Sequence, residues 1–181
     1  MGSDTTDIAA EIDALRFGIE KSLRYHQRRR AHYESLHRFL MLGVVLSGSA
    51  AFGGLFNNPE ALGLFGAGLG ALDLVFSFSI KARDHDFLHR RFSELAKEII
   101  GKRVPTQEDL AGWIQQRLDI EADEPPVYWA LEASCDNEIT LAKGRQRHGL
   151  VRLGLWRTLL MHWHRFEAAE MPRVAPPRAH T

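Results

Sequence analysis

The sequence predicts an all-α membrane protein: a two-transmembrane helical hairpin with a long N-terminal helix and a C-terminal cytoplasmic helical bundle. Two apolar runs, residues 39–56 and 61–80, are separated by the turn sequence NNPE. As helices they would be about 27 and 30 Å long, close to the hydrocarbon thickness of a bilayer. A chain of 181 residues is too small to bury two helices that are apolar on all sides, so we expect lipid around them.

Basic residues flank the hairpin on both outer ends and are absent from its turn. The positive-inside rule then places both termini of this multi-pass chain in the cytoplasm and the turn on the other side. The basic residues next to the bilayer either contact anionic head groups or only set the orientation. We expect them at the membrane surface: Arg28, Arg29, Arg30, Lys81 and Arg83.

The segments outside the hairpin are expected to be cytoplasmic helices followed by a tail. Residues 1–38 form the N-terminal helix, residues 81–170 form further helices, and residues 171–181, with three prolines, are disordered. Thr106 is the expected N-cap of a helix in the C-terminal part. The N-terminal helix has an apolar seam that needs a helical partner. It consists of Ile8, Ile12, Leu15, Ile19 and Leu23.

Two further helices have predicted apolar faces. In the helix that begins at Lys81, the side chains of Phe87, Phe92, Leu95 and Ile99 are expected to point inward. Near the C-terminus a basic amphipathic helix presents an apolar face opposite its arginines. That face either lies on the inner leaflet or packs against the N-terminal seam, and packing is slightly preferred. It consists of Leu153, Trp156, Leu160 and Trp163, opposite Arg152, Arg157 and Arg165.

Small residues recur every four positions along both apolar runs, which predicts close helix packing. One set is Gly43, Ser47 and Ala51, and a second set is Gly63, Ala67 and Ala71. The second run also contains a GxxxG pair, Gly66 and Gly70. Small residues let membrane helices approach closely. When the two helices of one hairpin pack together, one set of small residues remains without a partner, so we expect a homo-oligomer. The alternative is that the small residues serve only the packing within one hairpin.

Asp73 is the single acidic residue of the second run and is expected to face inward. Placing an aspartate near the bilayer centre costs about 2.5–3.5 kcal/mol on insertion scales, which disfavours a lipid-facing position. Two interpretations remain. Asp73, with Ser47 as a second intramembrane polar residue, lines a cation-favouring pore in an oligomer. Alternatively, its carboxyl group pairs with Ser47 or Ser49 across the hairpin.

The sequence indicates no catalytic constellation, cofactor motif or metal site. His85 and His89 stand four residues apart, but the glutamate of an HExxH zinc motif is missing, so we expect surface histidines. The single cysteine, Cys135, has no obvious partner base and is expected to be structural. The 23 basic and 23 acidic residues leave none of the basic excess typical of a nucleic-acid binder.

The order of these segments resembles a known family. A helix ending in YHQRRRAHYESLHR leads into the two runs, and ALDLVFSFSIKARDHDFLHRRF and IEADEPPVYWALEASCDNE follow. This arrangement, over residues 10 to 165, resembles the SLATT family, the two-transmembrane effector domains associated with SMODS nucleotidyltransferases and SLOG domains. The chain reads CDNE where the family pattern is expected to read CHNE, so Asp136 departs from it.

The resemblance implies a pore-forming effector of the bacterial inner membrane in a nucleotide-linked conflict or anti-phage defence system. It also implies a cytoplasmic sensor or nucleotidyltransferase as partner, and no catalytic residues. Without the resemblance, the residues indicate only a helical hairpin, an inward-facing Asp73 and helix faces suited to close packing. A membrane-anchored interaction scaffold without conductance therefore remains the alternative function.

Overall fold

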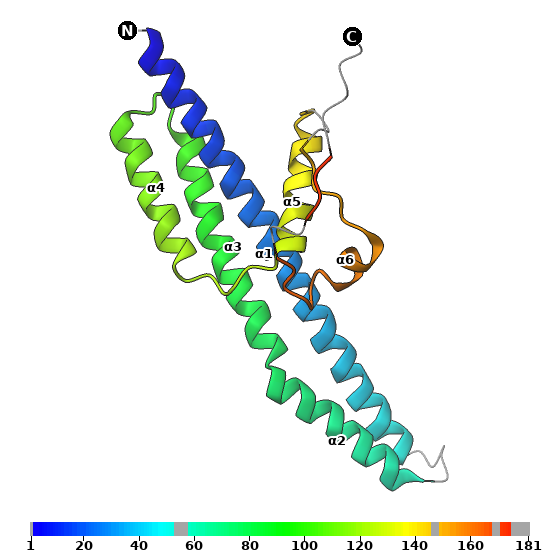
Figure 1. The fold of residues 1–181 in the computed structure, drawn as a ribbon. Coiled ribbons are helices and arrows are strands. Elements are labelled where there is room, and N and C mark those ends of the chain that lie inside the picture. The colour runs from blue at the N-terminus through cyan, green and yellow to red at the C-terminus, as the bar shows by residue number, and fades with distance from the viewer. Residues whose placement is uncertain (1, 53–57, 146–148, 168–170, 175–181) are drawn as a thin grey trace, which may run out of the picture. The chain divides into compact units, whose positions relative to one another are not determined.

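The computed structural model describes residues 2–52, 58–145, 149–167 and 171–174, and in the first helix it describes the side chains from residue 8 to residue 49 (Figure 1). In this part of the chain the secondary structure consists of helices and one isolated β-bridge, which confirms the all-α prediction. The helices are α1 (Gly2–Phe52), α2 (Pro59–Phe76), α3 (Phe78–Gly101), α4 (Gln107–Glu121), α5 (Trp129–Ala142) and α6 (Leu155–Leu160).

The chain divides into two compact units. The bundle unit consists of Met1–Gln27 and Phe87–Thr181, and the hairpin unit consists of Arg28–Asp86. Helix α1 runs without a break from the predicted cytoplasmic segment into the first apolar run, because no proline or glycine interrupts it between Ile19 and Leu42. Helices α1 and α3 therefore each contribute residues to both units.

The core of the bundle unit is built on the predicted seam of α1. Ile12, Leu15 and Ile19 are buried, and Ile8 and Leu23 pack against the same cluster. Their partners come from α3 and α4, which lie beside the N-terminal part of α1 in Figure 1. The preferred packing of the C-terminal amphipathic helix on this seam is therefore wrong. The partners are Leu88, Phe92, Leu95, Ile99, Leu110, Trp113 and Ile120.

The boundaries of α3 and α4 follow local sequence signals. Helix α3 ends at Gly101, and Thr106 caps α4 in a reciprocal capping box with Asp109. Three of the four expected inward residues of α3 are buried. Phe87 is exposed, because the buried side chains of α3 recur every three or four residues at positions 78, 82, 85, 88, 92, 95 and 99, and position 87 falls outside this series.

Helix α5 packs on α1 through a second, smaller cluster. Tyr25, Leu131 and Cys135 are buried together, which gives Cys135 a structural place in the bundle. The Tyr25 hydroxyl accepts a hydrogen bond from the Tyr128 backbone N–H at 3.1 Å. An ion pair of 2.6 Å between Lys21 and Glu132 adds to this contact at the surface.

Asn137 of α5 holds the C-terminal segment in place. Its side-chain amide donates to the Val151 carbonyl at 2.7 Å, and its carbonyl accepts from the Val151 N–H at 2.9 Å. Residues 171–174 pair with residues 149–152 in an antiparallel contact around the Val151–Arg173 bridge. The expected disordered tail therefore does not begin at residue 171, and residues 175–181 lie outside the described part.

In the hairpin unit, α2 and α3 form two helices where the sequence predicted one span of residues 61–80. The break is Ser77, a non-glycine residue in the left-handed region with φ of 51°. Its backbone N–H donates to the Asp73 carbonyl at 2.8 Å, and its hydroxyl donates to the Leu74 carbonyl at 3.1 Å. These bonds satisfy the end of α2 and compensate part of the cost of this conformation.

Candidate membrane-embedded site

The outward surface of the hairpin unit is apolar. Within Pro59–Gly101 the structure contains a helical stretch long and apolar enough to cross a membrane, and only 11% of its most apolar window is buried inside the protein. A core helix of a water-soluble protein would be mostly buried. The first predicted span is covered only in part, because residues 53–56 lie outside the described residues. The exposed side chains are Phe39, Leu42, Val45, Leu46, Leu64, Phe65, Leu72, Leu74, Val75 and Phe76.

The inner surface of the hairpin uses the small residues of both helices. A methyl group added at Gly66 would meet the Ser47 Cβ at 3.0 Å and the Val44 carbonyl oxygen at 3.7 Å. One added at Gly43 would meet the Leu69 Cδ1 at 2.5 Å. Gly43, Ser47 and Gly66 thus form the contact that closes the hairpin, which we call the closed stripe. Gly70 lies at its edge.

The other small residues of α2 do not take part in that contact. Among the residues that the structure describes, none lies within 4 Å of a methyl group added at Gly63, and Ala67 and Ala71 are exposed. We call these three residues the open stripe. Ala51 belongs to α1, but its side chain lies outside the described residues.

Asp73 is bonded across the hairpin to a histidine. Both carboxylate oxygens lie 3.0 Å from Nδ1 of His37 on α1, and the Asp73 side chain is 14% exposed. When the carboxyl group is ionised it can only accept, and Nδ1–H of His37 is then the donor. Neither serine proposed as a partner takes this place: the Ser47 hydroxyl donates to the Gly43 carbonyl at 2.7 Å, and Ser49 is exposed.

An aromatic and cationic cluster surrounds Tyr33 on α1. The ring of Tyr33 stacks on Phe78 and on His85, with centroids 6.2 and 5.7 Å apart. The Arg29 guanidinium lies over the same ring, 4.5 Å from its centroid, and donates to the Tyr33 hydroxyl. His85 is buried, so the expectation of a surface histidine is wrong for it. The stacking on Tyr33 gives the reason.

The five predicted surface cations have different surroundings. Arg29 is only 2% exposed, so its predicted place among lipid head groups is wrong, because the Tyr33 contact holds it inside the protein. Arg30 pairs with Glu34 at 2.8 Å and with Asp86, and these acids raise its pKa. Lys81 and Arg83 are exposed, and Arg28 is half-buried.

Sequence reasoning missed His37, Tyr33 and Arg29 as members of this polar interior. One signal points to His37: in an apolar hairpin, an acid needs a hydrogen-bond donor on the other helix. His37 is the last histidine before the first apolar run, and it meets this requirement. No comparable signal in the sequence identifies Tyr33 and Arg29.

The described residues contain no group of three or more histidine, cysteine, aspartate or glutamate side chains arranged to hold a metal ion. No protein-family model matches the chain, and neither a curated protein nor a solved structure matches it.

Proposed function

We propose that this chain is an oligomeric, pore-forming effector of the bacterial inner membrane. In this proposal the hairpin unit crosses the membrane twice with both termini in the cytoplasm, and the bundle unit responds to a cytoplasmic sensor or nucleotidyltransferase. The resemblance to the SLATT family supports the setting, a nucleotide-linked conflict or anti-phage system.

The observation that supports self-association is the open stripe on α2. The closed stripe already joins the two helices of one hairpin, yet Gly63, Ala67 and Ala71 remain exposed on α2. In lipid, small residues give no hydrophobic gain by themselves, and they stabilise a helix pair only by allowing close approach. A second helix that packs on the open stripe would belong to another protomer. Two helices cannot enclose a water path, so conductance requires such partners.

The His37–Asp73 pair defines what the acid does in this assembly. Its carboxylate is satisfied inside one protomer, which removes most of the cost of placing it in the membrane. Asp73 then contributes to a pore by fixing the two helices at one depth, and it reaches a lumen only if the pair opens.

A membrane-potential measurement tests this function. Cells that express the protein are expected to lose the potential reported by a voltage-sensitive dye, and Asp73→Leu is expected to reduce that loss at equal membrane abundance. His37→Gln is the matched variant, since it breaks the same pair but leaves the carboxylate. An intact potential together with a monomeric protein in mild detergent would contradict the proposal.

The same histidine–carboxylate pair favours a second function, a membrane-anchored scaffold without conductance. A paired and largely covered carboxylate offers little to a passing cation. The scaffold predicts that an unrelated two-span anchor in place of residues 39–80 preserves the cellular phenotype. The pore predicts that this replacement abolishes it.

A further inference from the structure

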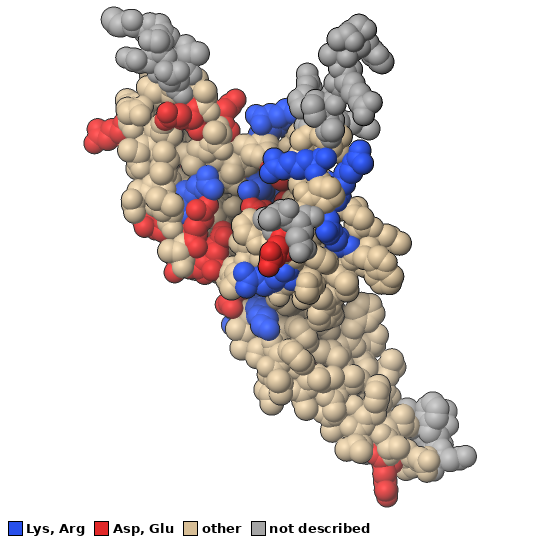
Figure 2. Space-filling model, viewed as in Figure 1, with Lys and Arg blue, Asp and Glu red and all other residues tan. Residues whose placement is uncertain are grey.

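The chain is electrically neutral, but its C-terminal part is not. Between Glu138 and Glu167 the sequence contains six basic residues and no acidic residue. In Figure 2, Lys and Arg side chains gather on the bundle unit around α5 and α6. We call the described part of this stretch, residues 139–145 and 149–166, the basic segment. Its basic residues are Lys143, which pairs with Glu20 at 3.0 Å, Arg145, Arg152, Arg157 and Arg165.

The arginines around α6 have no acidic partner among the residues that the structure describes. Two arginines elsewhere in the bundle unit are neutralised by acids: Arg117 pairs with Glu121 at 2.6 Å, and Arg91 pairs with Asp123. By contrast, the Arg157 guanidinium lies 5.9 Å from the ring of Phe166, and Arg165 donates to a backbone carbonyl. These contacts leave the positive charge uncompensated.

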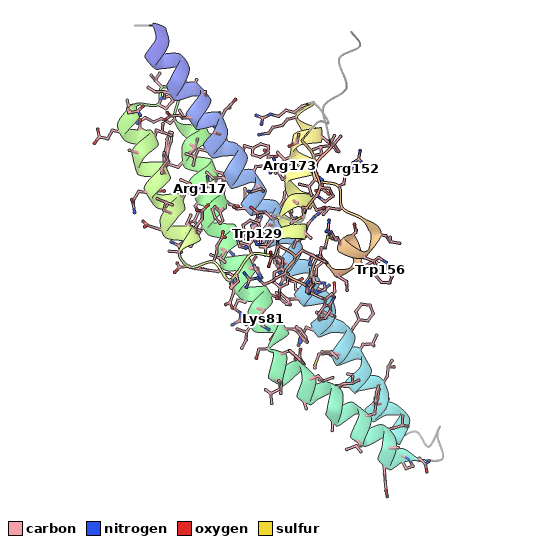
Figure 3. All side chains as sticks on the ribbon, in the orientation of Figure 1. Lys81, Arg117, Trp129, Arg152, Trp156 and Arg173 are labelled. Atoms are coloured by element: carbon pink, nitrogen blue, oxygen red, sulfur yellow. The ribbon has the colours of Figure 1, made fainter. Side chains whose placement is uncertain are left out.

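The same segment exposes large apolar side chains. Trp156 is 75% exposed, and Leu155, Leu159 and Trp163 are also exposed. Arg152 and Trp156 both lie on the flank of the bundle unit that carries α6, as the labels in Figure 3 show. Met161 points the other way and packs against the cluster of Tyr25, Leu131 and Cys135. Arg157, four residues before Met161, is half-buried on this docked side. The segment therefore exposes tryptophan and leucine side chains, together with Arg152 and Arg165, to its surroundings.

We propose that the exposed side of the basic segment docks on an anionic lipid surface. Tryptophan prefers the level of the head groups, leucine side chains enter the acyl boundary, and arginines contact phosphate groups. A nucleic acid would accept the arginines but would leave Leu155 and Leu159 in water. A folded acidic protein would need a matching apolar patch, whereas a bilayer accepts any apolar shape.

This inference rests on the proposed membrane location, and the experiment separates the two. The full-length protein is reconstituted into vesicles of phosphatidylcholine with or without phosphatidylglycerol, with bromine atoms on the lipid chains as fluorescence quenchers. Resistance to alkaline extraction reports insertion of the hairpin independently. Quenching that disappears in Trp156→Phe/Trp163→Phe reports docking of the basic segment, and Trp129→Phe on α5 is the control for tryptophan loss.

The expected result is quenching that depends on phosphatidylglycerol. Arg152→Gln/Arg165→Gln, at two exposed positions of the segment, is expected to lower the ratio of docked to undocked segment by about 25-fold, at about fivefold per arginine. Lys97→Gln/Arg103→Gln removes the same charge from exposed positions of α3 and the following loop, and should change the ratio less than twofold.

Two results would overturn the inference. The first is an inserted hairpin with no quenching, or with equal quenching in both lipids. The second is binding of RNA by the detergent-solubilised protein that depends on Arg152 and Arg165, without lipid quenching. A protein extracted by alkali would instead contradict the proposed function, and flotation with phosphatidylglycerol vesicles would then test the segment by itself, with failure to float overturning the inference.

Discussion

The bundle unit and the hairpin unit distribute polar and apolar side chains in opposite ways. In the bundle unit, Phe92 and Ile99 are buried and ion pairs such as Lys21–Glu132 lie at the surface. In the hairpin unit, Leu64 and Leu74 face outward, while His37 and Asp73 bond between the helices. One chain thus contains a unit with an apolar core and a polar surface, as proteins have in water, and a unit with an apolar surface and a polar pair between its helices, for which we propose a lipid environment.

This difference shows that the same residue type can contribute oppositely in the two units. An apolar side chain in the bundle unit stabilises the fold by leaving water, at about 25 cal/mol per Å². On the hairpin surface it makes no such contribution to packing, and close helix contact is provided by Gly43, Ser47 and Gly66.

The largest expected effect separates the two units directly. Phe92→Ala removes a ring that is 0% exposed and should cost about 3–5 kcal/mol of unfolding free energy. Leu74→Ala, at 79% exposed, should change it by less than about 0.5 kcal/mol. Unfolding in detergent, followed by the fluorescence of the buried Trp113, measures both. Equal effects would contradict the division into two kinds of packing.

A smaller effect should distinguish the closed stripe from the open stripe. Gly66→Leu forces a side chain against Ser47 and the Val44 carbonyl, and should destabilise the hairpin by about 1–3 kcal/mol. Gly63→Leu meets open space, so it should leave the hairpin intact and weaken only the proposed association. Cross-linking between cysteines placed at 44 and 70, where Cγ2 of Val44 lies 3.9 Å from a methyl group added at Gly70, reports hairpin closure, and detergent sedimentation reports association. An oligomer unchanged by Gly63→Leu would remove the assigned role of the open stripe.

The smallest expected effect tests a part of the bundle unit that behaves as an ordinary water-soluble helix. The Thr106 backbone N–H, then Lys102 and the Thr106 hydroxyl, donate to Asp109 and lower its pKa from 3.8 to about 2. Because the folded pKa is depressed, this stabilisation is complete above pH 3.8 and is lost as pH falls towards 2. Thr106→Ala should cost about 1 kcal/mol at pH 7.

The pH dependence has its own control. Asp109→Asn cannot ionise, so its unfolding midpoint should lack the part of the acid-induced decrease that comes from this carboxylate. Identical pH profiles for Asp109→Asn and the unchanged protein would contradict the assignment.

The sequence by itself determined the helical class, the α1 seam, the cap at Thr106 and the apolar runs, because each depends on local periodicity or on a single capping residue. The tertiary structure decided the partners: α3 and α4 for the seam, His37 for Asp73, and Tyr33 for Arg29 and His85. Local patterns show that a face or a charge needs a partner. Which residue meets that need depends on the register of helices far apart in the chain, and only the folded arrangement sets that register.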